Sequence, residues 1–155
     1  MKRHSIGTIA SMLLLLIPAC ASNKFNSKYF DDIQKYIKEE FISEHEVNLS
    51  IKPNDKPKKY VVPVGDIETY NTVFKEDYKI DVDFDKQMIF VCSFFSVYRM
   101  EHYLEKIELV DENLVIECTH EKCATGAGCA CAPYQRWCAI RMDIVEYSDI
   151  SFVGE

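Results

Sequence analysis

The residues best suited to chemistry in this sequence are cysteines, and five of them lie close together in its last quarter. They are Cys118, Cys123, Cys129, Cys131 and Cys138, with His120 among them. The residues between Cys123 and Cys131 are small, so this segment cannot bury enough apolar surface to fix its own shape. We therefore expect cross-links or a bound ion to hold it.

Two kinds of chemistry suit such a segment. Disulfides would hold it by restricting the unfolded chain, at about 2–4 kcal/mol each. A zinc site built from cysteines and His120 is the rival, because these are the usual ligands of zinc. No Cys-x-x-Cys pair, which structural zinc sites usually contain, occurs in the sequence. We therefore favour disulfides, with a metal site or partly free thiols as the alternatives.

The expected pairing follows from the strands that bracket the segment. Cys118 and Cys138 fall on predicted strands on either side of it and are expected to face each other, so we predict that they form a bridge. Cys129 and Cys131 are too close in sequence to bond to each other comfortably, and each should pair elsewhere. Cys92 lies in a wholly apolar strand and is expected to be a small buried residue.

A cysteine nucleophile with His102 or His120 as its base would make the chain an enzyme. A catalytic thiol needs a nearby cation or a helix N-terminus that lowers its pKa. The sequence places no cysteine on a strand-to-helix turn and contains no signature of a cysteine hydrolase. We therefore predict a protein that is not an enzyme, without catalytic residues, and we expect His45 and His102 to be solvated surface residues.

Three aspartates have the initial spacing of a calcium loop. When Asp81 is counted as the first position, the full pattern also requires Gly at the sixth position and Glu at the twelfth. Lys86 and Cys92 occupy these positions, so Asp83 and Asp85 are better explained as the solvated face of a strand. We predict no bound metal and no cofactor.

The N-terminus has the pattern of a secretory signal. Residues Met1–His4 are positively charged, and the apolar run from Ile6 to Ala19 is shorter than the roughly 20 residues that span a bilayer. Residues 17–20, Ile-Pro-Ala-Cys, resemble the lipobox of bacterial lipoproteins, where the chain is cut before a lipid-modified cysteine. We predict a signal peptide over residues 1–19, a lipid on Cys20 and a tether over residues 20–26. An ordinary secretory signal or an uncleaved anchor is the alternative.

Composition limits the remaining possibilities. Removal of residues 1–19 from the 155 takes away Lys2 and Arg3 and changes the formal net charge from −7 to −9. Nucleic-acid binding requires clustered positive charge, so we exclude it. The whole chain has 48% hydrophobic residues, and residues 27–155 are expected to form one globular domain. An even number of cysteines after Cys20 fits disulfides in an exported chain.

Periodicity predicts the elements. Apolar residues at helical spacing predict an amphipathic helix from Ser27, its N-cap, to Ser43, with Asp31 and Asp32 near the positive end of its dipole. A short helix capped by Asp66 follows, with Ile67, Tyr70, Val73 and Phe74 facing inward. The predicted strands are 47–51, Tyr60–Val64 (an edge strand, because of Pro63), Tyr78–Phe84, Met88–Phe95 in the sheet centre, Leu104–Val110, Leu114–Thr119 and Arg136–Ile144. Asp111-Glu112-Asn113 is the expected hairpin turn.

The order of these elements resembles a known family. The short helix at Asp66–Phe74, the motif Val82-Asp83-Phe84-Asp85-Lys86, an apolar strand and a hairpin are similar to the C-terminal domain of protease complex subunit PrcB, found in bacterial lipoproteins. The resemblance extends from about Tyr60 to Asp143. It implies a non-catalytic partner of an exported protease, and no functional residue is carried over from it.

These observations together predict a small α+β domain. We expect a largely antiparallel sheet, an N-terminal amphipathic helix and one further short helix. The predicted function is that of a non-catalytic binding or assembly protein, lipid-anchored to a membrane of the bacterial cell envelope and facing the periplasm or the exterior, with a protein partner. The alternative is a metal- or redox-active module built on residues 118–138.

Overall fold

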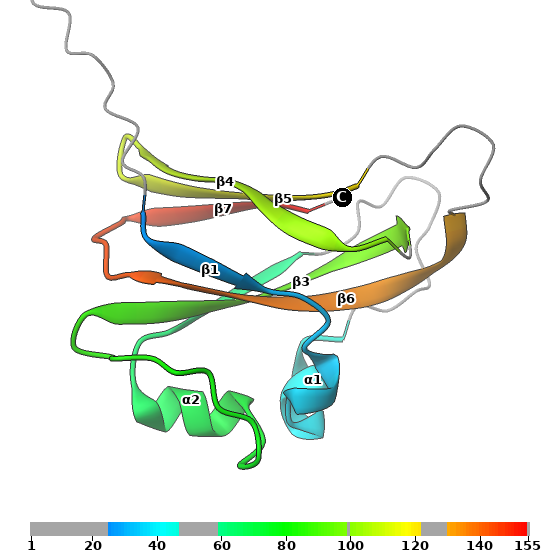
Figure 1. The fold of residues 1–155 in the computed structure, drawn as a ribbon, viewed down its shortest axis with the longest axis horizontal. Coiled ribbons are helices and arrows are strands. Elements are labelled where there is room, and N and C mark those ends of the chain that lie inside the picture. Colours follow the sequence, from blue (N-terminus) through cyan, green and yellow to red (C-terminus); the bar gives the residue numbers. More distant parts are fainter. Residues whose placement is uncertain (1–24, 47–58, 99, 122–129, 155) are drawn as a thin grey trace, which may run out of the picture.

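The computed structural model describes residues 25–46, 59–98, 100–121 and 130–154. In this part of the chain, two β-sheets and a set of helices form three layers, with the larger sheet in the middle (Figure 1). The elements are β1 (Ser27–Phe30), the 3-10 helix η1 (Gln34–Tyr36), α1 (Glu39–Glu44), β2 (Tyr60–Val64), α2 (Ile67–Val73), β3 (Gln87–Tyr98), β4 (His102–Val110), β5 (Asn113–His120), β6 (Ala130–Asp143) and β7 (Asp149–Gly154). The predicted α+β class is confirmed.

The larger sheet has the strand order β1-β6-β3-β2 and is antiparallel throughout. The smaller sheet has the order β4-β5-β7, in which β4 and β5 form an antiparallel hairpin and β7 joins in parallel. As predicted, the apolar run Met88–Phe95 lies on an interior strand, and Pro63 lies on the edge strand β2, where a missing N–H is tolerated.

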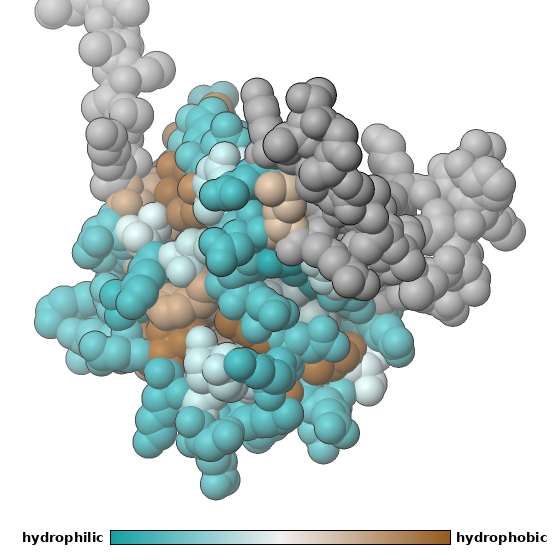
Figure 2. All heavy atoms as spheres, turned by 45° about the vertical axis from the view of Figure 1, so that its right-hand side comes forward, coloured by the Kyte–Doolittle hydropathy of each residue, from teal (hydrophilic) through white to brown (hydrophobic). Residues whose placement is uncertain are grey.

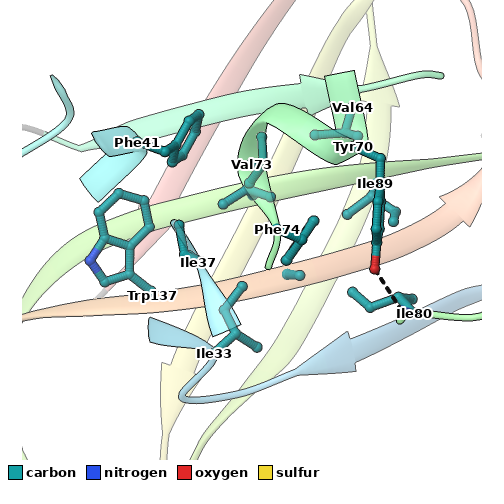
Figure 3. Packing of buried hydrophobic residues seen from close by; sticks show 12 residues of the cluster. Ile33, Ile37, Phe41, Val64, Tyr70, Val73, Phe74, Ile80, Ile89 and Trp137 are labelled. Carbon is teal, nitrogen blue, oxygen red and sulfur yellow. Dashed lines mark hydrogen bonds between the residues drawn. The ribbon is translucent and has the colours of Figure 1, made fainter. Parts of the chain in front are cut away.

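Two hydrophobic cores lie on opposite faces of the larger sheet, because successive residues of a strand point to opposite sides. The helix-side core, between this sheet and the helices, contains Ile33, Ile37, Phe41, Val64, Tyr70, Val73, Phe74, Ile80, Ile89, Val91, Trp137 and Ala139 (Figure 3). The inter-sheet core contains Met88, Phe90, Cys92, Phe94, Leu114, Ile116, Cys118, Cys138, Ile140 and Met142. The neighbours Trp137 and Cys138 on β6 therefore belong to different cores.

The predicted helix from Ser27 to Ser43 is wrong over most of its length. The chain instead forms β1, which pairs with β6, then η1, and only Glu39–Glu44 is α-helical. Its backbone bonds to a distant strand and to a distant helix: Ile33 N–H donates to the Trp137 carbonyl of β6 at 3.0 Å, and Lys38 N–H donates to the Val73 carbonyl of α2 at 2.9 Å. The apolar stripe is nevertheless buried, because Ile33, Ile37 and Phe41 all reach the helix-side core.

The predicted strand Tyr78–Phe84 is also wrong as an element. The segment pairs with neither sheet, although its alternation does place Ile80 in the helix-side core and Tyr78, Val82 and Phe84 against it. The short helix α2 is confirmed, with the Asp66 carboxylate accepting a hydrogen bond from the Thr69 N–H at 2.7 Å. Its first residue, Ile67, is not inward: 62% of it is exposed.

The C-terminal half follows the prediction with two additions. The hairpin of β4 and β5 turns at Asp111 and Glu112, both with positive φ, as two-residue hairpin turns require. The last predicted strand begins earlier, as β6, and is followed by β7, which was not predicted. The strand predicted over 47–51 lies outside the described residues. No helix in the described ranges has the length and apolar character needed to cross a membrane.

Candidate functional sites

Three cysteines of the inter-sheet core form the first candidate site, which we call the thiol cluster. Cys92 on β3 and Cys138 on β6 are direct cross-strand partners in the larger sheet. Cys118 lies on β5, in the opposite sheet. The exposed fraction is 0% for Cys92 and Cys138 and 2% for Cys118, and all three are free thiols. Three separate strands thus bring three thiols together in a dry environment.

Cys138 is the centre of the thiol cluster. Cys92 is its cross-strand partner, Cys118 packs in the same core, and the Tyr29 ring packs against that core. Burial raises the pKa of Cys138, but hydrogen bonding from these three groups to its thiolate acts in the opposite sense, and the net direction is downward. Burial raises the pKa of Cys92, and the hydrogen bond to Cys138 together with burial raises that of Cys118. Cys138 therefore has one thiol neighbour in its own sheet and one in the opposite sheet.

A polar network continues from Tyr29 along the same core. The Tyr29 hydroxyl donates to Asp31 Oδ1 at 3.3 Å, and Arg136 donates to the same carboxylate from Nε at 2.9 Å and from Nη2. The His102 N–H donates to Asp31 Oδ2 at 3.0 Å. Burial raises the pKa of Asp31, but the bonds from Arg136 and His102 outweigh it, so the pKa lies below its usual value.

Arg136 is almost fully enclosed, with 8% of its side chain exposed. Its Nη1 donates to the Tyr134 hydroxyl at 2.5 Å, so both ends of the guanidinium have partners. The expected place of Asp31, in the first turn of a helix, is therefore wrong. It directly follows β1 and forms an ion pair with a residue 105 positions away. No local signal in the sequence marks such a pair.

His102 is the second correction in this network, because it is 3% exposed rather than solvated. Its Nε2 lies 3.2 Å from Ser96 Oγ, and its Nδ1 lies 3.0 Å from the Met100 carbonyl oxygen. The ring packs against Phe94 and His120, with centroids 5.4 and 5.5 Å apart respectively. The network therefore ends in a histidine pair between the two sheets.

The predicted cysteine sites are only partly within the described residues. Cys118 and Cys138 lie in the same core, but β5 and β6 belong to different sheets, so the two cysteines are not on neighbouring strands. Cys92 is buried as predicted, and it lies in the same core. The bridge between Cys118 and Cys138 stays a prediction. Cys131 falls on β6, while Cys20, Cys123 and Cys129 lie outside the described residues. Over the described ranges, no group of three or more His, Cys, Asp or Glu side chains is arranged to hold a metal ion.

A surface groove beside α2 is the second candidate site. It has a volume of about 440 Å³ and lies between α2 and the irregular segment that leads to β3. Tyr70, Ile80, Val82 and Phe84 supply apolar lining. The charged lining residues are Lys75, Glu76, Lys79 and Asp81. Much of the surface in Figure 2 is hydrophilic, with smaller hydrophobic areas between polar side chains.

The Tyr70 hydroxyl holds the outer wall of this groove in place. It accepts a hydrogen bond from the Ile80 N–H at 2.8 Å, shown as the dashed line in Figure 3, and donates to the Tyr78 carbonyl at 3.1 Å. The Tyr78 ring also stacks on Tyr36 at 3.9 Å between centroids. Burial of the ring raises the pKa of Tyr70, so its hydroxyl stays protonated as the donor to Tyr78. The groove is thus preformed rather than dependent on a ligand.

Comparison with known proteins adds no relative. No family model matches the chain, and neither a curated protein nor a solved structure is significantly similar to it. The two sites described above are therefore the basis on which a function is inferred.

Proposed function

We propose that this chain is a lipid-anchored, non-catalytic binding protein of the bacterial cell envelope. In this proposal the groove beside α2 binds an extended, apolar segment of a protein partner. The observation that supports it is the groove itself, whose volume of about 440 Å³ falls within the range of roughly 300–1,000 Å³ common for ligand pockets. Its apolar lining would hold side chains, and its charged residues of both signs would fix orientation.

The resemblance to the PrcB family points to the same place. Val82 and Phe84 of the motif line the groove, and so do Ile67, Tyr70 and Asn71 of the preceding helix. Some of the residues that carry the resemblance therefore line the groove, and they do not serve only to fill a core. The family implies a partner that is an exported protease or a subunit of its complex, and we propose that kind of partner here.

Site-specific photocrosslinking in the native envelope tests the groove. A photoreactive amino acid at Ile67, which is 62% exposed, should form one defined protein adduct. The same residue placed at Val110 of β4, which is 47% exposed on the smaller sheet, is the matched control and should not form it. Val82→Glu should reduce the Ile67 adduct at least about tenfold, whereas Val115→Glu on β5 should leave it unchanged. Equal adducts from both positions, or none from Ile67, would contradict the proposal.

The anchor has a separate test. If Cys20 carries the lipid, Cys20→Ser should abolish metabolic labelling with a radioactive fatty acid and should block processing of the precursor or release the protein from the membrane. Two or three acyl chains give stable attachment, whereas a protein without them relies on weaker contacts. Unchanged labelling and membrane retention in the variant would show that Cys20 is not the attachment point.

A further inference from the structure

The thiol cluster has one more cysteine than a bridge requires. Cys138 has a thiol neighbour in its own sheet, Cys92, and another in the opposite sheet, Cys118, and all three are buried in one core. A single structural disulfide would use two of these sulfurs. The third would then remain in contact with the bond, in a position to attack it.

Both bonds to Cys138 are sterically reasonable. Directly opposed residues of an antiparallel pair have Cα atoms about 4.5–5.5 Å apart, within the range that a disulfide spans, and Cys92 and Cys138 are such a pair. Cys118 approaches from the smaller sheet and packs in the same buried core as Cys138. Because all three thiols lie in one core, the two bonds to Cys138 exclude each other.

The surroundings favour reaction at Cys138. The Tyr29 hydroxyl has one hydrogen, which donates either to the Cys138 sulfur or to Asp31, whose negative charge is neutralised by Arg136. Hydrogen-bond donors around a sulfur stabilise the thiolate, and the thiolate is the species that attacks a disulfide. The cluster is therefore more than three small apolar side chains that happen to fill space.

We propose that the thiol cluster is a redox-active disulfide site in which Cys138 bonds to Cys118 or to Cys92, one at a time. The oxidant is a low-molecular-weight disulfide. The site does not depend on the groove or on its partner. It differs from the predicted module over residues 118–138 because its third member, Cys92, lies on β3, outside that range.

The chemistry balances in two steps. In oxidation, the Cys138 thiolate attacks one sulfur of the small disulfide, which leaves as a thiolate. The neighbouring protein thiolate then attacks Cys138 and displaces the second half, so two protein thiols become one disulfide while one small disulfide becomes two thiols. In exchange, the Cys92 thiolate attacks Cys138, the bond to Cys118 breaks, and Cys118 takes up the proton that Cys92 lost. Exchange needs no further oxidant.

The two bonds constrain the fold differently. The bond between Cys118 and Cys138 fastens the two sheets together, whereas the bond between Cys92 and Cys138 lies within the larger sheet and leaves the smaller one free to separate. Since the thiols are at most 2% exposed, a small disulfide reaches them only when the sheets open. Oxidation of the folded protein should therefore be at least about 100-fold slower than in denaturant.

Peptide mapping tests the proposal directly. Trypsin cleaves after Lys and Arg, so Cys92, Cys118 and Cys138 fall in separate peptides, 87–99, 107–122 and 137–141, and the cysteines at 123, 129 and 131 share the peptide 123–136. The full chain, purified from membranes in detergent, is equilibrated in buffers of reduced and oxidised glutathione, alkylated, digested and analysed by mass spectrometry. We expect 137–141 linked to 107–122 and also to 87–99, in proportions that continue to change after the glutathione is removed.

Alanine variants make the same test selective. Cys92→Ala should leave only the link between 107–122 and 137–141, and Cys118→Ala only the link between 87–99 and 137–141. Cys138→Ala removes both links, because 137–141 then contains no cysteine, and it should leave Cys92 and Cys118 mainly as thiols. If a variant does not fold, the peptide map of the wild-type protein alone tests the proposal. The proposal is overturned if the folded wild type keeps all three cysteines as thiols in oxidising buffer, if Cys138 forms only one of the two bonds, or if its main partner is 123–136.

Discussion

The helix-side core and the inter-sheet core share the larger sheet but bury different chemistry. The helix-side core is aliphatic and aromatic, and its Tyr70 hydroxyl is fully used in holding the segment around Ile80. The inter-sheet core contains three thiols and, at its end, the buried polar residues Ser96, His102 and Arg136. One core depends mainly on filling volume, while the other also depends on keeping buried polar groups paired.

This difference has an energetic consequence. Loss of apolar volume destabilises a core in proportion to the cavity left behind. Loss of one member of a buried ion pair also leaves a charge without a partner in a poorly solvated place. The two cores should therefore respond differently to the same kind of substitution, and the following predictions are ordered by the size of the expected effect.

The largest effect is expected from a charge placed in the helix-side core. Ile37 is 0% exposed and no cation is among the residues of this core, so Ile37→Asp should destabilise the fold by about 5 kcal/mol or more and prevent folding. Circular dichroism and thermal melting measure this. Ile37→Val is the matched control, with an expected loss of about 1 kcal/mol. A soluble Ile37→Asp protein with an unchanged melting temperature would show that Ile37 and its apolar neighbours do not pack in a core.

The inter-sheet core should be most sensitive at its ion pair. Arg136→Met keeps much of the volume but leaves Asp31 without its main partner, so we expect a loss of about 3–5 kcal/mol. In the double variant Arg136→Met with Asp31→Asn, the unpaired charge is also removed. Its loss should be smaller than the sum of the two single losses by about 1–3 kcal/mol. Denaturant unfolding of the four proteins measures the difference, and additive losses would mean that the pair is not coupled.

Acid should weaken the inter-sheet core through the same carboxylate. The pKa of Asp31 is lowered in the folded protein, so the unfolded chain binds a proton more readily. The stabilisation is complete above the pKa of the unfolded chain, near 4, and is lost as the pH falls through the folded pKa. The effect should be smaller than that of Arg136→Met. Asp31→Asn should show a weaker pH dependence between roughly pH 2 and 5, and identical profiles would exclude Asp31 as the titrating group.

The comparison also explains what the sequence could predict. Periodicity identified the buried members of the helix-side core, such as Ile33, Ile37 and Phe41, because hydrophobic spacing reports which side chains face inward. It predicted the wrong secondary structure for them, because apolar residues four positions apart can belong to a helix or to a strand followed by turns. Tertiary hydrogen bonds, such as that from Ile33 to Trp137, decided between these alternatives.

The sites in the inter-sheet core were harder to predict from the sequence. Its sites depend on which strands pair and in which register, and these are long-range properties. Cys92 lies opposite Cys138 only because β3 and β6 align in this register, and a shift by one residue would place them on opposite faces. The pairing of Asp31 with Arg136 depends in the same way on the antiparallel contact between β1 and β6. Short, local features such as the Asp66 cap and the hairpin turn were predicted correctly, since neighbouring residues alone determine them.

The smallest effect is expected at the Asp66 cap, at the edge of the helix layer. Its carboxylate accepts hydrogen bonds from the Thr69 N–H at 2.7 Å and from the Thr69 hydroxyl at 2.9 Å. Asp66→Ala removes these acceptors without opening a cavity in either core, so the melting temperature should fall by only about 3 °C. Asp66→Asn, which keeps an acceptor, should lose less. A fall as large as that of Arg136→Met would mean that α2 is not a peripheral helix but a support for both cores. Because residues of α2 also line the groove, Asp66→Ala should in addition lower the yield of the Ile67 photocrosslink.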